Sequence, residues 1–295
     1  MLNLFFFCLG ACLGSFFNVC IYRLPAGKSV ISPRSQCACG SPIAWFDNLP
    51  VISWFILGGR ARCCDLTFSA RYPVVEAVTG VLFLLSWWLF GVDNPTYALG
   101  VMLLCSFLIP AIFIDLDHMI IPDIFSIGGT LAGVAFSCIF PALHGIEGQA
   151  LVAGIFGGVE GVLGLLVGSA TIYWIGILGE ILFRKEAMGE GDVKFLGCIG
   201  AFCGWQGALF SIFGGALLGC LILLPLLLLS KFRKPKPISD SDGESGNPSS
   251  PRFGMHIPFG PLLAAGALLY MFAFQARVDA YFTNLWSTLQ EFATY

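Results

Sequence analysis

Two groups of carboxylates stand beside apolar runs, where charged side chains are costly. Asp115, Asp117 and Asp123 follow the apolar run 96–114, and the segment Gly189-Glu190-Gly191-Asp192 precedes another apolar run. Ionisable residues at membrane depth or at the ends of membrane spans usually have a function. We therefore expect these two groups to contribute to a functional site.

Facing carboxylates support a definite chemistry. Two such groups share a proton, because like charges a few ångströms apart cannot both ionise. The ionised carboxylate then takes a proton from water that attacks a peptide carbonyl, and the other protonates the oxyanion and later the leaving amine. The same residues would also serve a proton-coupled carrier, so the carboxylates alone leave a peptidase and a transporter open.

The neighbouring residues suggest supporting roles. Gly189 and Gly191 would allow close backbone approach and let a peptide lie against the chain. Asp123 follows Pro122 at an expected helix start, which favours an N-cap role for its side chain. Glu76 is expected to pair with Arg71 near the membrane surface.

Composition indicates a membrane protein. The chain is 57% hydrophobic and 11% charged, whereas soluble domains are roughly half apolar and a quarter charged. Apolar runs of about 20 residues predict membrane-spanning helices. We predict an all-α, polytopic membrane helix bundle with about eight transmembrane helices, at residues 2–22, 75–92, 96–114, 122–142, 150–183, 193–208, 209–230 and 258–276.

The basic residues predict the orientation. Lys and Arg concentrate on the cytoplasmic side of bacterial membrane proteins. With eight spans and the N-terminus outside, all of the 15 Lys and Arg residues except Arg277 lie inside or at the inner end of a span. This orientation places both carboxylate groups at the cytoplasmic face. The net charge of -3 does not suggest a nucleic-acid partner.

The chain divides into five predicted parts. They are a first transmembrane helix (1–22), a small cytoplasmic loop module containing cysteines (23–74), a transmembrane core (75–230), a flexible cytoplasmic linker (231–257), and a last helix with an external tail (258–295). The linker prediction rests on its Ser, Asp, Gly, Asn and Pro content, which cannot build a core.

Six segments in order resemble the bacterial type IV prepilin leader peptidases, a family of GxGD aspartic peptidases. The matching segments are residues 14–25, 48–54, 69–76, 115–123, 189–194 and 257–261. The resemblance implies that Asp115 and Asp192 are the catalytic pair. By the same resemblance, the supporting residues of the active site are Gly189, Gly191, Asp117, Asp123 and Lys194.

The family implies a substrate and a location. Its members cleave the leader peptide of prepilins or pseudopilins at the cytoplasmic face of the bacterial inner membrane, and proteolysis needs no cofactor. Many members also methylate the new N-terminus with S-adenosylmethionine. A non-catalytic, pilin-binding assembly factor would share the same partners, the prepilin and the lipid bilayer, and is the third hypothesis.

The cysteines of the loop depart from the family pattern. Members with this feature carry two Cys-x-x-Cys pairs, which suit a tetrahedral zinc site. Here the thiols are Cys37 and Cys39, then Cys63 and Cys64, with Ala61 where a cysteine is expected. These spacings would strain a single tetrahedral site, so the sequence is compatible both with bound zinc and with four free thiols. It also leaves undecided whether the protein has methyltransferase activity.

Overall fold

The computed structural model of the chain describes residues 1–32, 36–37, 39–64, 66–184, 188–232 and 258–293. These residues fold almost entirely into helices, and six helices are long and apolar enough to cross a membrane. The predicted fold class, a polytopic helical membrane bundle, is therefore confirmed. The predicted number of eight spans is not established by helix length.

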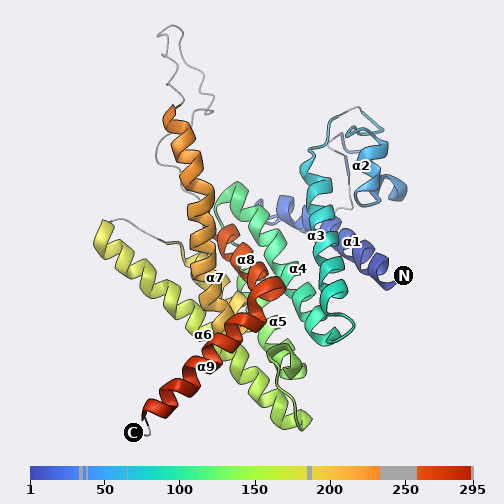
Figure 1. Cartoon of the computed structure of the whole chain (residues 1–295). Coiled ribbons are helices and arrows are strands. Elements are labelled where there is room, and N and C mark those ends of the chain that lie inside the picture. The colour runs from blue at the N-terminus through green and yellow to red at the C-terminus, as the bar shows by residue number, and fades with distance from the viewer. Residues whose placement is uncertain (33–35, 38, 65, 185–187, 233–257, 294–295) are drawn as a thin grey trace.

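The first three long helices form one side of the molecule (Figure 1). α1 (Leu2–Arg23) packs along α3 (Arg71–Phe90), and α4 (Pro95–His118) packs against both. A Cβ atom on Gly10 of α1 would lie 2.7 Å from the carbonyl oxygen of Thr79 in α3, so only glycine permits this approach. Asn94 caps α4 by accepting a hydrogen bond from the Tyr97 N–H over 3.0 Å.

α4 is the central helix. Its side chains Leu104, Leu108 and Ile114 are completely buried, and they belong to the same core cluster as Phe195 of α7 and Leu263 of α8. The sequence predicts the end of this span at residue 114, but the helix continues for one more turn to His118. Asp115 is therefore part of a helix and not of a loop.

The next segments form the other side. α5 (Asp123–Ile139) is shorter than the other apolar helices and leads through η2 (Pro141–His144) into the long α6 (Ala150–Phe183). α6 packs on α7 (Glu190–Phe232), which also contacts α5 and α8. Residues 231 and 232, predicted to begin the linker, belong to α7, and residues 233–257 lie outside the described residues.

α7 contains a reversal of the chain at Gly204, whose backbone is non-helical with φ 68° and ψ 178°. A Cβ atom on Gly168 of α6 would lie 3.0 Å from the carbonyl oxygen of Leu196 and 3.1 Å from the Cβ of Ala208. Twelve residues of straight helix would separate those two positions by about 18 Å. The two segments, 190–203 and 205–232, therefore run back along each other. The predicted boundary between the sixth and seventh spans, at residues 208 and 209, is wrong by about one turn. The chain reverses earlier, at Gly204, because glycine adopts this backbone conformation readily.

The C-terminal region is a bent helix. α8 (Gly260–Leu269) continues through a π-helical turn, η3 (Tyr270–Phe274), into α9 (Gln275–Ala293). A π-helical turn leaves carbonyl groups free, and the Tyr97 hydroxyl donates to the Met271 carbonyl over 3.1 Å. In Figure 1, α9 leaves the bundle and carries the C-terminus clear of the other helices.

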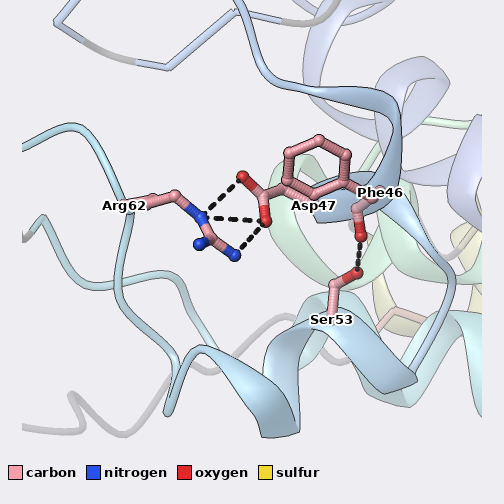
Figure 2. A network of polar contacts seen from close by, with 4 residues as sticks. All are labelled: Phe46, Asp47, Ser53 and Arg62. Carbon is pink, nitrogen blue, oxygen red and sulfur yellow. Dashed lines mark hydrogen bonds and ion pairs between the residues drawn. The ribbon is translucent and has the colours of Figure 1, made fainter.

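The loop module between α1 and α3 is folded. It contains η1 (Trp45–Asn48), α2 (Ile52–Ile56) and two isolated bridges, Gln36 with Pro42 and Arg60 with Thr67. Figure 2 shows two of its internal contacts. The Arg62 guanidinium donates to both carboxylate oxygens of Asp47 over 2.8–3.2 Å, and the Ser53 hydroxyl donates to the Phe46 carbonyl over 3.0 Å.

The closest helix contact yields a prediction. A Cβ atom on Gly164 of α6 would lie 2.0 Å from the Gly200 carbonyl oxygen of α7. Because neither backbone can move aside cheaply, we expect Gly164→Ala to destabilise the protein by about 1–3 kcal/mol. Thermal unfolding in detergent measures this change.

Gly128→Ala in α5 is the matched control, since its Cβ would meet no atom within 4 Å. Alanine favours a helix over glycine by about 1 kcal/mol, so this variant should be as stable as the parent or slightly more so. Equal stability of the two variants would contradict the close contact between α6 and α7.

Candidate active site

Asp115 lies in the last turn of α4 and is almost completely buried, with 6% of its surface exposed. The backbone N–H of Gly260, at the start of α8, donates to its carboxylate. A Cβ atom on residue 260 would lie 2.6 Å from Asp115 Oδ2. Among the described residues no donor reaches this Oδ2 atom, although it is buried. The buried Oδ2 atom is thus free to carry a proton or to contact a reactant.

Asp192 is the third residue of α7 and is half-buried. Its charge interacts directly with that of Asp115, and its carboxylate accepts from the backbone N–H of Gly189. A charge interaction therefore links two carboxylates that come from α4 and α7 and are 77 residues apart in sequence. Sequence reasoning predicted both residues, and the structure brings them together.

The glycines beside Asp192 are not required by packing. Among the described residues, a Cβ on Gly189 would come no closer than 4.0 Å to a neighbour, and one on Gly191 no closer than 3.5 Å. The predicted close backbone approach is therefore not made within the chain at these positions. It occurs instead at Gly260, which the sequence analysis included only as part of a motif and assigned no role.

An ion pair with a residue of α3 holds Asp117 in place. The Arg71 guanidinium forms an ion pair with Asp117, donates to the Phe113 carbonyl over 2.6 Å and lies 5.0 Å from the centre of the Phe113 ring. Asp115 lies between these two residues on the same helical turn. Arg71 thus fixes the turn that carries the buried carboxylate.

An ion pair with a residue of α7 holds Asp123 in place. Its carboxylate accepts from the Lys194 ammonium over 3.0 Å. The predicted N-cap role is wrong, because Pro122 occupies the N-cap and Asp123 is the first helical residue. Asp123 and Lys194 therefore join the first turns of α5 and α7 beside Asp192.

Glu76 joins the loop module to the helices, and the predicted pair with Arg71 is wrong. Its carboxylate accepts from the Val51 N–H over 2.7 Å and also interacts with Ser15 and Asn18 of α1. Val51 has a φ of 64°, which is a strained conformation for a β-branched residue. The Glu76 carboxylate therefore holds a tight turn of the module against α1 and α3.

The four loop cysteines form one cluster despite their irregular spacing. All four sulfur atoms lie within 4.8 Å of one another. Cys37 and Cys64 are 3.4 Å apart, as are Cys39 and Cys63. Each short sequence pair contributes one thiol to each of these two contacts, so the irregular spacing does not keep the four thiols apart.

The cluster has the chemistry of a metal site. Four thiolates around a zinc ion at about 2.3 Å lie about 3.8 Å from one another, close to the distances observed. A hydrogen bond with Ser41 lowers the pKa of Cys39 to about 6, whereas the hydrogen bond with Cys39 raises the pKa of Cys63 to about 12. One thiolate is therefore available at neutral pH to begin metal binding.

Comparisons with known proteins agree with this site. Residues 8–90 match the bacterial peptidase A24 N-terminal domain, and residues 102–224 match the type IV leader peptidase family. A prepilin leader peptidase/N-methyltransferase of Klebsiella pneumoniae is 36% identical over 68% of this chain and 85% of its own length. The chain belongs to the type IV leader peptidase family.

Two further relatives have the same description. One from Myxococcus xanthus (strain DK1622) is 38% identical over 75% of this chain, and the match spans 63% of that protein's length. One from Pseudomonas aeruginosa is 31% identical over 87% of this chain and 85% of its own length. No solved structure matches significantly. The family places the chain among peptidases, which confirms the resemblance found in the sequence.

Gly260 provides the sharpest structural test of this site. We expect Gly260→Ala to lower the rate of peptide cleavage per molecule about 100-fold. A Cβ at this position displaces the Asp115 carboxylate, and a displacement of about 1 Å in an active site can lower the rate by that factor. Cleavage by purified protein, normalised to the folded fraction, measures the effect. Gly128→Ala should cleave normally, and normal cleavage by Gly260→Ala would contradict the contact.

Proposed function

We propose that the chain is an intramembrane aspartic endopeptidase that removes the leader peptide of prepilins or pseudopilins. The observation that carries the proposal is the charge interaction between Asp115 and Asp192, together with the Asp115 Oδ2 atom that is buried without a donor among the described residues. The relatives described as prepilin leader peptidases support the substrate class.

The reaction follows from the pair. One carboxylate is ionised and takes a proton from water as the water oxygen attacks the scissile carbonyl carbon. The other carboxylate carries the shared proton and donates it to the oxyanion. When the C–N bond breaks, one carboxylate gives its proton to the leaving amine, and the other takes a proton from a hydroxyl of the tetrahedral intermediate as it collapses to the acid. The pair thus returns to the state with one shared proton.

The supporting residues keep the pair in place. Asp117 acts through Arg71 and Asp123 through Lys194, because each of these ion pairs joins a catalytic helix to a neighbour. Gly189 and Gly191 leave room beside Asp192, since added Cβ atoms would meet nothing closer than 3.5 Å. We propose that the substrate backbone occupies this room.

The active site faces the cytoplasm in this proposal. The distribution of Lys and Arg supports the orientation, and the reversal at Gly204 supports the predicted count of eight crossings. Asp115 and Asp192 then lie at the inner surface of the bacterial inner membrane. There the basic leader of a prepilin can reach them while its apolar helix stays in the bilayer.

Zinc is the metal that fits the cysteine cluster, and we propose that Cys37, Cys39, Cys63 and Cys64 hold one ion. Zinc would staple a module too small to build its own core. The carboxylate pair lies in α4 and α7, outside the loop module that carries the thiols, so we propose that proteolysis does not need the metal. Methylation with S-adenosylmethionine stays a prediction from the family, and we assign no residue to it.

The catalytic pair predicts a clear mutational pattern. We expect Asp115→Asn and Asp192→Asn each to abolish leader cleavage, because members of a catalytic unit cannot substitute for one another. Co-expression with a prepilin, followed by gel analysis of leader loss, measures cleavage. Such loss by the parent would also exclude a carrier and a non-catalytic assembly factor.

Asp117→Asn and Asp123→Asn are the matched controls. Each removes one carboxylate charge at the same membrane face but leaves the pair intact, so cleavage should fall by only about tenfold or less. Near-normal cleavage by either Asp115→Asn or Asp192→Asn, with the controls folded, would rule out the proposed pair.

The orientation predicts the labelling of single added thiols. A maleimide reagent that cannot cross the membrane should label Glu147→Cys in intact cells but not Lys28→Cys. The parent protein is the background control, because its exposed loop thiols, Cys39 and Cys63, lie on the protected side in this proposal. Labelling of Lys28→Cys in intact cells would reverse the topology and place the pair on the wrong face.

The zinc proposal predicts that the metal stabilises the module without acting in catalysis. Purified protein should contain about one zinc per chain, measured by elemental analysis. Replacing the four loop cysteines by serine should lower yield and protease resistance, while cleavage per surviving molecule should persist.

Four other cysteines give the control. Replacing Cys8, Cys12, Cys138 and Cys220 by alanine also removes four thiols, all of them exposed and located in the membrane helices. The zinc content of this variant should equal that of the parent. Absence of stoichiometric zinc from the parent would refute the metal site. An abundant but inactive loop variant would show that the module takes part in proteolysis.

A further inference from the structure

α9 is an amphipathic helix whose apolar face is exposed. Five large apolar side chains on it are 42–75% exposed: Tyr281, Leu285, Trp286, Leu289 and Phe292. At 100° per residue these positions occupy one side of the helix. The opposite side carries the short polar residues Thr283, Asn284 and Ser287. Such a face needs an apolar partner outside the described part of the chain.

The bundle fixes the direction of α9. The Tyr270 hydroxyl, in the π-helical turn, donates to the Asp279 carboxylate over 2.7 Å. The Phe282 ring packs edge-on against Trp205, 4.8 Å away, just after the reversal at Gly204. These contacts hold the first two turns of α9, so the rest of the helix projects from the bundle in a defined direction (Figure 1).

The position of α9 identifies its partner. The helix begins where the apolar helix α8 and its π-helical turn end, at the end of the molecule that carries Gly204 and is opposite Asp115 and Gly260. Because α8 belongs to a candidate membrane span, α9 begins within reach of lipid. Trp and Tyr, which supply two of its five exposed apolar side chains, are the residues enriched at membrane–water interfaces.

We propose that α9 lies in the surface of the outer leaflet and inserts its apolar face among the lipids. Residues 278–293 contain only two charged residues, Asp279 and Glu291. Burial of apolar surface therefore provides the attachment, and no cluster of Lys or Arg is present to require anionic lipid. The segment predicted as an external tail is in this proposal an anchor on the membrane.

The anchor has a consequence for the bundle. α8 joins the Asp115 contact at Gly260 to the base of α9, so a helix fixed at the outer surface also fixes how deep α8 sits. The anchoring itself does not rest on the proposed peptidase function, and its test requires no cleavage assay.

Photocrosslinking from single positions tests the proposal. Benzoylphenylalanine is placed at Leu285 or Leu289 on the apolar face, or at Asn284 or Ser287 on the polar face. Each full-length variant is reconstituted into phosphatidylcholine nanodiscs and illuminated, and lipid adducts are measured by intact mass. All four positions are exposed in the structure, so the substitutions should not disturb folding, and size-exclusion profiles check this.

We expect adducts at Leu285 and Leu289 to exceed those at Asn284 and Ser287 at least about fivefold, because only the apolar face enters the lipid. The excess should persist when NaCl rises from about 0.1 M to about 1 M, which shortens the Debye length from about 10 Å to about 3 Å. Equal adduct yields on the two faces would overturn the proposal. Crosslinks between two chains from Leu285 and Leu289, in place of lipid adducts, would identify a second copy as the partner and would also overturn it.

Discussion

The candidate active site depends on the charge interaction between two carboxylates that are carried by different helices. Asp115 is almost completely buried, and its charge acts directly on Asp192. Two like charges in a site of low polarity repel strongly, so the surrounding helices must hold them together. The central position of α4, which is the most buried of the spans, supplies one rigid support. The reversal at Gly204 supplies the other, because it returns α7 along itself and fixes the segment that begins with Asp192.

Contacts between helices surround the pair on three sides. Arg71 holds the turn before Asp117, Lys194 holds the start of α5, and Gly260 brings α8 against Asp115. The loop module reaches the same network through Glu76, which binds both the module and α1. Since α3 carries Arg71 and Glu76 within two turns of each other, the module and the active site share one helix. This arrangement explains how the loop module can support the active site from outside the helices that carry the carboxylates.

The sequence predicted the main features of the fold because hydropathy records which segments are surrounded by lipid. Spans such as 150–183 matched their helix to the residue. The two carboxylate groups were found from their cost at the membrane edge, and the family resemblance then singled out Asp115 and Asp192. Features that depend on three-dimensional packing were missed. The turn at Gly204 lies inside a continuous apolar run, and the Gly260 contact joins residues that are 145 positions apart. Neither leaves a periodic signal in the chain.

The cysteine loop and Asp123 show a second limit of prediction from the sequence. The spacing of the thiols indicated strain, yet two short backbone bridges bring them into one cluster. Asp123 was expected to cap a helix, yet Lys194, on another helix, provides its partner. In both cases local sequence rules considered only neighbours along the chain, and contacts between distant segments decided the structure.

The central claim is that Asp115 and Asp192 work as a pair with one shared proton. The most direct measurement is the cleavage rate per molecule, at limiting substrate, as a function of pH for the purified protein in lipid. A pair with one shared proton predicts a bell-shaped profile, because activity requires one carboxylate ionised and one protonated. Asp117→Asn should keep both limbs of that profile. A profile with a single limb, or one that loses a limb only in Asp117→Asn, would contradict the account.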